Sequence, residues 1–176
     1  MSDWDHPGLV PYRHAIDRVR GWQFGPKGLL LSGPTGRGKT RALFDLYRRM
    51  AHDGEHEVRY WFAGDWFARL QEEVRFGRDD ARGWVEATAA HPVVILDDLG
   101  QEAVTTARAD WSASHFFRFL DLRIATGLPL LCSTNLTADE IAGKMSRGAG
   151  IRQEPLIRRL LELTEVVKFQ PTSESK

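Results

Sequence analysis

The sequence predicts an α/β fold built on a central parallel sheet, and three observations support this prediction. From residue 28 onward, short aliphatic segments alternate with segments of helical periodicity. The aliphatic segments are continuously apolar, as in VVIL at residues 93–96, which is typical of strands covered on both faces. Polar motifs follow several of these strands, at the edge where such sheets bind ligands.

Composition limits the functional classes. The formal net charge of the 176-residue chain is zero, so no overall positive field attracts it to nucleic acid or anionic lipid. A single cysteine, Cys132, excludes an internal disulfide framework and favours the reducing cytoplasm. No apolar run approaches the roughly 18 residues that a membrane span needs. We therefore expect a soluble cytoplasmic protein with no membrane partner.

Five strands and several helices are expected in alternation. The expected strands are residues 29–31, 58–62, 93–96, 130–133 and 166–169. The expected helices carry apolar stripes: one from Leu43 to a stop at Gly54, one over residues 67–74 before Gly77, and one over residues 113–124 before Gly127. Thr137 to Glu140 has the pattern of a capping box, and Pro155 suits the first turn of a last helix.

The stretch GPTGRGKT matches the phosphate-loop pattern G-x-x-x-x-G-K-[ST] between a strand and a helix. Its glycines let successive backbone amides point at phosphate oxygens, and the helix turns its positive end toward them. Lys39 would reach the β- and γ-phosphates, and the Thr40 hydroxyl would hold Mg²⁺. We expect ATP or ADP to be surrounded by Gly33, Pro34, Thr35, Gly36, Arg37, Gly38, Lys39, Thr40 and Arg41.

Two carboxylates end the strand in VVILDDLG. A parallel sheet would deliver them to the same edge as the phosphate loop. Asp97 is predicted to bind Mg²⁺, usually through water, and Asp98 to polarise the attacking water as general base. The alternative for both is a solvated loop pair.

Two further polar groups follow the same logic. Asn135, at the end of LPLLCSTN, would touch the γ-phosphate and the attacking water, or else serve as a turn residue ahead of the Thr137 cap. Arg158 and Arg159 lie in the last predicted helix. Either one can serve as an arginine finger toward a neighbouring subunit, with Arg159 favoured, or both form a solvated helix face.

The order phosphate loop, Asp-Asp strand, Asn strand and arginine helix resembles the AAA+ ATPases, and within them the DnaC/IstB-like group. The likeness covers residues 28–169 and is carried by GPTGRGKT, VILDDLG, STNL, the RRLL helix and VRYWFAGDWFARLQEE. It implies a three-layer sandwich with strand order 5-1-4-3-2, and ATP hydrolysis at subunit interfaces of a ring or helical homo-oligomer. It also implies that Asn135 is sensor 1 and that Arg159 is the finger.

The resemblance also predicts the domain organisation. Residues 1–27 form an N-terminal segment that helps enclose the adenine, around Tyr12 to Phe24, residues 28–170 form the ATPase core, and residues 171–176 form a flexible tail. The chain departs from the group in two ways. Few residues follow the fifth strand, so the small helical lid is expected to be absent, and only a short segment precedes the core.

The use of the nucleotide stays open between classes. A basic loop with Lys144, Arg147 and Arg152 would contact single-stranded DNA without sequence preference, or would be an ordinary solvated loop. The family resemblance favours a slow, oligomer-dependent ATPase that serves DNA replication by helicase loading, or transposition, with a replicative helicase or a transposase as partner. The alternatives are a small-molecule P-loop kinase and a nucleotide-binding module with little turnover.

Overall fold

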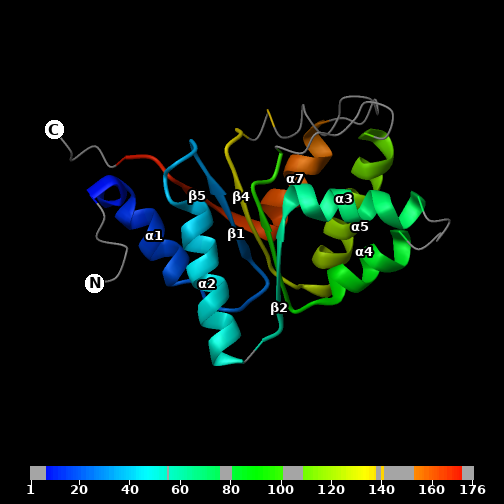
Figure 1. Ribbon diagram of the computed structural model, residues 1–176, viewed down its shortest axis with the longest axis horizontal. Coiled ribbons are helices and arrows are strands. Elements are labelled where there is room, and N and C mark those ends of the chain that lie inside the picture. The colour runs from blue at the N-terminus through cyan, green and yellow to red at the C-terminus, as the bar shows by residue number, and fades with distance from the viewer. Residues whose placement is uncertain are drawn as a thin grey trace.

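The protein is described from a computed structural model, which defines residues 7–54, 56–75, 81–100, 109–137, 140 and 153–171. Five strands form one parallel sheet in the order β2-β3-β4-β1-β5 (Figure 1). They are β1 (Gly28–Ser32), β2 (Val58–Phe62), β3 (Val93–Asp97), β4 (Leu130–Thr134) and β5 (Thr164–Lys168). Counted from the β5 edge, this is the predicted order 5-1-4-3-2, and the prediction is confirmed.

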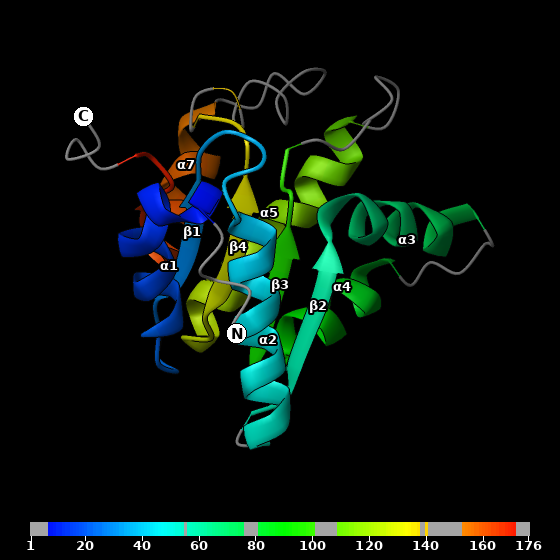
Figure 2. The same cartoon turned by 60° about the vertical axis from the view of Figure 1, so that its left-hand side comes forward.

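Helices connect the strands and cover both faces of the sheet. They are the short 3₁₀ segment η2 (Pro7–Tyr12), α1 (Arg13–Arg20), α2 (Lys39–Asp53), α3 (Ala63–Arg75), α4 (Ala81–Ala90), α5 (Ala109–Thr126) and α7 (Gln153–Leu163). Helices α1 and α2 lie on one face, and α3, α4, α5 and α7 lie on the other (Figures 1 and 2). The predicted three-layer architecture is therefore the observed one.

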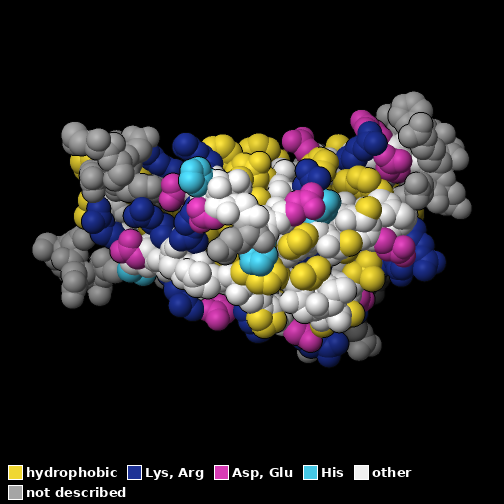
Figure 3. Space-filling view, turned by 90° about the horizontal axis from the view of Figure 1, so that it is seen from below, with side chains coloured by type: hydrophobic (Ala, Val, Ile, Leu, Met, Phe, Trp, Pro, Cys, Tyr) yellow, Lys and Arg dark blue, Asp and Glu magenta, His cyan; other side chains and the backbone are white. Residues whose placement is uncertain are grey.

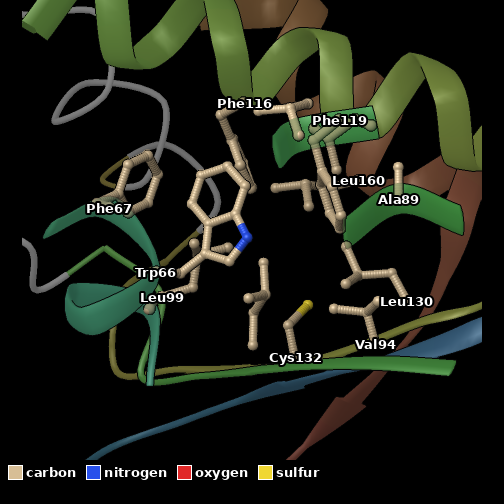
Figure 4. Close-up of a cluster of buried hydrophobic side chains, with 14 of the residues drawn as sticks. Trp66, Phe67, Ala89, Val94, Leu99, Phe116, Phe119, Leu130, Cys132 and Leu160 are labelled. Carbon is tan, nitrogen blue, oxygen red and sulfur yellow. The ribbon is translucent and has the colours of Figure 1, made fainter. Parts of the chain in front are cut away.

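Each central strand supplies alternate side chains to two separate cores. Val94, Leu96 and Cys132 face the α3–α5 layer, where the fully buried indole of Trp66 packs among aromatic rings that include Phe116 and Phe119 (Figure 4). Ile95 and its neighbours on the same face pack against α1 and α2. Because both faces are covered, the strands read as continuous apolar runs in the sequence.

Some element boundaries differ from the predicted ones. Strand β5 begins at Thr164 rather than at residue 166, since it is an edge strand that follows α7 directly and starts with polar residues. Helices α1 and α4 were not predicted, because α1 has only eight residues and α4 has a weak apolar stripe, and such segments are helical mainly through tertiary packing. The stop at Gly54 is confirmed by its left-handed φ of 67°, whereas Gly77 lies outside the described residues.

The capping box at Thr137 is present in its reciprocal form. The Thr137 amide donates to Oε2 of Glu140 at 2.8 Å, and the Glu140 amide donates to the Thr137 hydroxyl at 3.3 Å. These two bonds satisfy amides that a helix start leaves without intrahelical partners.

A buried arginine ties the amino ends of β3 and β4 together. The Arg123 side chain is fully buried near the end of α5, and its guanidinium donates to the carbonyls of Ala89, His91, Pro92 and Pro129. Pro92 and Pro129 immediately precede the two strands. Burial lowers the pKa of Arg123 to about 10, so the side chain is still a cation at neutral pH.

The end of the molecule opposite the phosphate loop carries basic and acidic side chains intermixed with apolar ones (Figure 3). This mixture agrees with the zero formal net charge of the chain. Among the described helices, none combines the length and the apolar character that crossing a membrane requires.

Candidate nucleotide-binding site

The phosphate-loop sequence forms an open loop between β1 and α2, at the carboxyl edge of the sheet (Figure 2). Gly36 and Gly38 have φ angles of 78° and 89°, which residues with a Cβ rarely adopt, and Gly38 is the residue from which α2 starts. The loop borders a cleft of about 610 Å³, a size that suits a nucleotide. The cleft is lined by Leu9, Thr35, Gly36, Arg37, Gly38, Lys39, Thr40, Arg41, Phe44, Asp98 and Asn135.

Lys39 reaches back across the loop. Its ammonium group donates to the carbonyls of Gly33 at 2.6 Å and Pro34 at 2.8 Å, and to Oδ1 of Asn135 at 2.6 Å. Burial lowers the pKa of Lys39, while the negative charges of Asp98 and Asp97 oppose that shift. The lysine is therefore a desolvated donor aimed at the centre of the loop, and two carboxylates favour its charged form.

Asn135 connects Lys39 to Asp98. Its side-chain amide nitrogen donates to Oδ1 of Asp98 at 2.8 Å, while its oxygen accepts from Lys39. Asp98 is the one non-glycine residue of the described chain with a positive φ, 65°. Aspartate tolerates this conformation better than most residues, and strain of this kind is concentrated at functional sites. The turn directs the Asp98 carboxylate into the cleft, where the predicted base and the predicted sensor are in contact.

Asp97 is held more deeply than Asp98. Its side chain is fully buried, and each carboxylate oxygen accepts a hydrogen bond from a neighbouring strand. The Tyr60 hydroxyl on β2 donates to Oδ2 at 2.6 Å, and the Ser133 hydroxyl on β4 donates to Oδ1. Burial and the contact with Asp97 raise the pKa of Tyr60 above its ordinary value, so the phenol stays protonated and remains a donor.

The oxygen donors of the site suit Mg²⁺. Asp97 supplies a carboxylate and Thr40, exposed at the start of α2, supplies a hydroxyl. Hard oxygen ligands together with retained waters are what Mg²⁺ prefers. The two hydrogen bonds that Asp97 already accepts leave lone pairs for an indirect contact through water. Within the described residues there is no group of three or more histidine, cysteine or acidic side chains suited to a metal.

The N-terminal segment reaches the same cleft from the other side. Leu9 lines the cleft and lies against Gly38, where a Cβ would come within 2.8 Å of the leucine Cδ2. The ring of the buried Tyr12 lies under the Arg37 guanidinium, 5.1 Å from its carbon. Segment η2 therefore sits beside the loop, where the predicted adenine-side contacts would be made.

Arg159 lies away from this cleft and has partners on its own chain. Its guanidinium donates to both carboxylate oxygens of Asp121 and stacks over Phe117 at 5.1 Å. Arg158 is exposed and contacts no acidic side chain within the described part of the chain. The basic residues Lys144, Arg147 and Arg152 lie outside the described residues.

Sequence reasoning missed Tyr60 and Ser133 as functional residues. Once the sheet register is known, strand parity places both on the Asp97 face: Tyr60 is two residues before the β2 partner of Asp97, and Ser133 lies on the same face of β4. Ser133 also accepts from the Asp98 amide at 3.0 Å, so one hydroxyl organises both acids. Phe44 and Leu9 were missed as cleft-lining residues, since apolar residues near a phosphate loop carry no sequence signal of their own.

Comparison with known proteins finds the same fold in DNA replication proteins. Neither a protein-family model nor a curated protein sequence matches the chain. Among solved structures, the DnaC helicase loader superposes with a TM-score of 0.72 at 21% identity, over 96% of this chain and 95% of that one. DnaI gives a TM-score of 0.68 at 21% identity, over 94% and 87% of the two chains.

A third match is the replication initiator DnaA bound to AMPPCP and single-stranded DNA. It has a TM-score of 0.68 at 13% identity, over 90% of this chain and 45% of the longer DnaA chain. The P-loop AAA+ fold predicted from the sequence is thereby confirmed, and these neighbours are consistent with the predicted DnaC-like resemblance. At these identities the likeness establishes the fold alone.

Proposed function

We propose that this chain is a AAA+ ATPase of the DnaC/IstB-like family, which binds ATP with Mg²⁺ and hydrolyses it as a cytoplasmic switch in DNA replication. The observation that carries the proposal is the hydrogen-bonded chain from Lys39 through Asn135 to Asp98, beside the buried Asp97 and within the phosphate-loop cleft. Helicase loading is the favoured role, because a helicase loader and a replication initiator share the fold. Service to a transposase is the other role known for the family that the sequence resembles.

Each residue has a role that its position supports. The loop amides and Lys39 bind the β- and γ-phosphates, and Thr40 and Asp97 hold Mg²⁺, which would neutralise phosphate charge. Asp98 accepts a proton from the attacking water. Asn135 touches both the lysine and this carboxylate, so it can orient the water relative to the terminal phosphate.

Asp98→Asn is expected to keep ATP binding and to reduce turnover by about 100-fold or more, since general-base catalysis contributes roughly 10²–10⁴-fold. Asparagine tolerates the same positive φ and offers the same Oδ1 acceptor to Asn135, so the backbone turn should survive. Binding of a fluorescent ATP analogue and phosphate release would be measured on the same preparation. Asp45→Asn, on α2 away from the cleft, is the charge-matched control. Wild-type turnover in Asp98→Asn would contradict the base role.

The arginine finger is tested by mixing subunits. Arg159→Ala subunits keep the phosphate loop, and Lys39→Ala subunits keep the finger, so an active interface should form only in the mixture if the finger acts in trans. The same mixing with Arg158→Ala decides between the two arginines. Asp121→Ala is the control, because it removes the partner of Arg159 on its own chain while it leaves the arginine in place. Arg159→Ala activity equal to the wild type would exclude Arg159 as the finger.

The wider role is tested by assembly and by substrate. We expect a homo-oligomer, a ring or a helical filament, that forms with a non-hydrolysable ATP analogue and binds single-stranded DNA through Lys144, Arg147 and Arg152. Mass in solution, with and without the analogue and the DNA, measures this assembly.

A screen of small phosphoacceptors distinguishes the proposed ATPase from a P-loop kinase. Phosphate transfer to any acceptor other than water would contradict it.

A further inference from the structure

We propose that Tyr60 is a positioning residue, which orients the Asp97 carboxylate for the Mg²⁺ that accompanies ATP. The inference rests on the proposed function and deepens it. Nothing in the phosphate-loop or Asp-Asp sequence patterns points to this residue, since it lies on β2, the far edge strand of the sheet.

Asp97 is held between two hydroxyl donors that come from opposite sides. Strand β3 lies between β2 and β4 in the sheet, and each neighbour contributes one donor to a different oxygen of Asp97: Tyr60 at 2.6 Å to Oδ2, and Ser133 to Oδ1. A carboxylate that accepts a hydrogen bond from only one donor can still rotate about its Cβ–Cγ bond. Two donors fix the plane of the group, and one lone pair on each oxygen is left for the waters of a metal ion.

A tyrosine is required at this position because the donor must reach along the strand. Tyr60 is paired with Ile95 in the sheet, and Phe62 is paired with Asp97. The hydroxyl must therefore extend over two residues, about 6.6 Å along β2. Serine or threonine is too short for this distance, and a flexible side chain would lose more rotamer entropy on being held there.

The ring of Tyr60 is held in place by an aromatic cluster on the α2 side of the sheet. Its centroid lies 5.5 Å from that of Tyr47, 5.9 Å from that of Phe44 and 5.8 Å from that of Phe62, all in edge-on arrangements. Phe44 also lines the nucleotide cleft. The cluster fixes the direction of the phenol, and with it the direction of the hydrogen bond to Asp97.

Tyr60→Phe is a clean test of this role. It removes one oxygen and keeps the ring contacts, whereas Ser133→Ala would also remove the acceptor of the Asp98 amide. Tyr47→Phe is the matched control: it removes a hydroxyl from the neighbouring ring of the same cluster and leaves the Tyr60 bond to Asp97 intact.

The first measurement is the Mg²⁺ dependence of binding, with a fluorescent ATP analogue as the probe. Affinity in EDTA should be equal in the wild type, Tyr60→Phe and Tyr47→Phe, because the loop amides and Lys39 are unchanged. The Mg²⁺ concentration that gives half of the metal-dependent increase should rise about tenfold in Tyr60→Phe and stay unchanged in Tyr47→Phe. In steady-state kinetics, we expect Tyr60→Phe to need more Mg²⁺ than the wild type for half-maximal turnover. Its KM for MgATP should be nearly unchanged once Mg²⁺ saturates.

The second measurement is made on the wild-type protein, and variants serve only to assign its resonances. The chain has three tyrosines, so the wild-type protein labelled with 3-fluorotyrosine gives three ¹⁹F resonances. The Tyr60 resonance, assigned from Tyr60→Phe or by exclusion from Tyr47→Phe and Tyr12→Phe, should shift when Mg²⁺ is added to the ATP-bound protein. The other two should shift less.

The outcomes separate this inference from the proposed function. If the wild type responds to Mg²⁺ while Tyr60→Phe has the same Mg²⁺ dependence, or if the Tyr60 resonance does not respond, the positioning role is overturned and the ATPase proposal stands. If the wild type binds the ATP analogue neither with nor without Mg²⁺, the proposed function itself fails and this inference fails with it.

Discussion

Lys39→Ala is expected to lower ATP affinity by roughly 100- to 1,000-fold, which amounts to the loss of about two charge-assisted hydrogen bonds. Lys39 is buried, and its ammonium group donates to Gly33, Pro34 and Asn135. Alanine leaves no group that can reach the β- and γ-phosphates. Calorimetric titration of ATP into the variant and the wild type measures the change.

The fold should survive this substitution. Two of the three acceptors of Lys39 are loop carbonyls beside exposed residues, so water can replace the lost donor at a cost of about 1 kcal/mol in the free energy of unfolding. Arg48→Ala is the matched control, since it removes an exposed positive charge two turns further along α2, outside the cleft. Unchanged ATP affinity in Lys39→Ala would refute the phosphate-loop assignment.

Arg123→Met is expected to lower the free energy of unfolding by about 3–5 kcal/mol. Methionine has a similar length but donates no hydrogen bond, so the carbonyls of Ala89, His91, Pro92 and Pro129 would lose their shared donor in a buried place. Replacing both partners of a buried polar contact by apolar groups can be harmless, but backbone carbonyls cannot be replaced. Urea unfolding followed by tryptophan fluorescence measures the change.

Arg118→Met provides the comparison on the same helix. Arg118 is part of a partly exposed cluster with Glu86, and pairs of this kind contribute at most about 1 kcal/mol. The ratio of the losses in the free energy of unfolding in Arg123→Met and Arg118→Met therefore tests which factor matters more. It compares the buried contacts at the strand ends with the mere loss of a positive charge. A loss of less than 1 kcal/mol in Arg123→Met would show that the strand ends are held by other contacts.

Much of the fold follows from patterns that a parallel sheet imposes on a sequence. The strand at 93–96 was expected and found because both of its faces are covered, and the edge strand at 58–62 because it is rich in aromatic residues. The end of α2 at Gly54 was expected and found because only glycine readily takes the conformation found there. Helix α4 was not expected, since its alanines, threonine and single valine give too weak a stripe. Its helical state depends on contact with α3 and α5, which the local sequence does not encode.

For the candidate site too, the sequence predicted some positions, and others depend on the tertiary structure. Lys39, Asp97, Asp98 and Asn135 were expected there because each lies at or after the carboxyl end of a strand, and strand order brings those ends together. The roles of these residues stay predictions, and so does the finger, which lies outside the cleft. Its helix α7 packs against α5, where Arg159 pairs with Asp121, and the effect of a second subunit on this pair is a question of assembly.

By itself, the sequence determined the residue types that the proposed triphosphate and magnesium would need, and their places after successive strands, because phosphate and magnesium chemistry restricts those positions to few amino acids. Only the tertiary structure decided which neutral side chains support them. The hydroxyls of Tyr60 and Ser133 come from strands on either side of Asp97, and the carbonyls of Ala89, His91 and Pro92 that bind Arg123 are far from it along the chain. These partners become neighbours only when the chain folds. In the sequence, a tyrosine or a serine in a strand looks the same whether or not a carboxylate lies beside it.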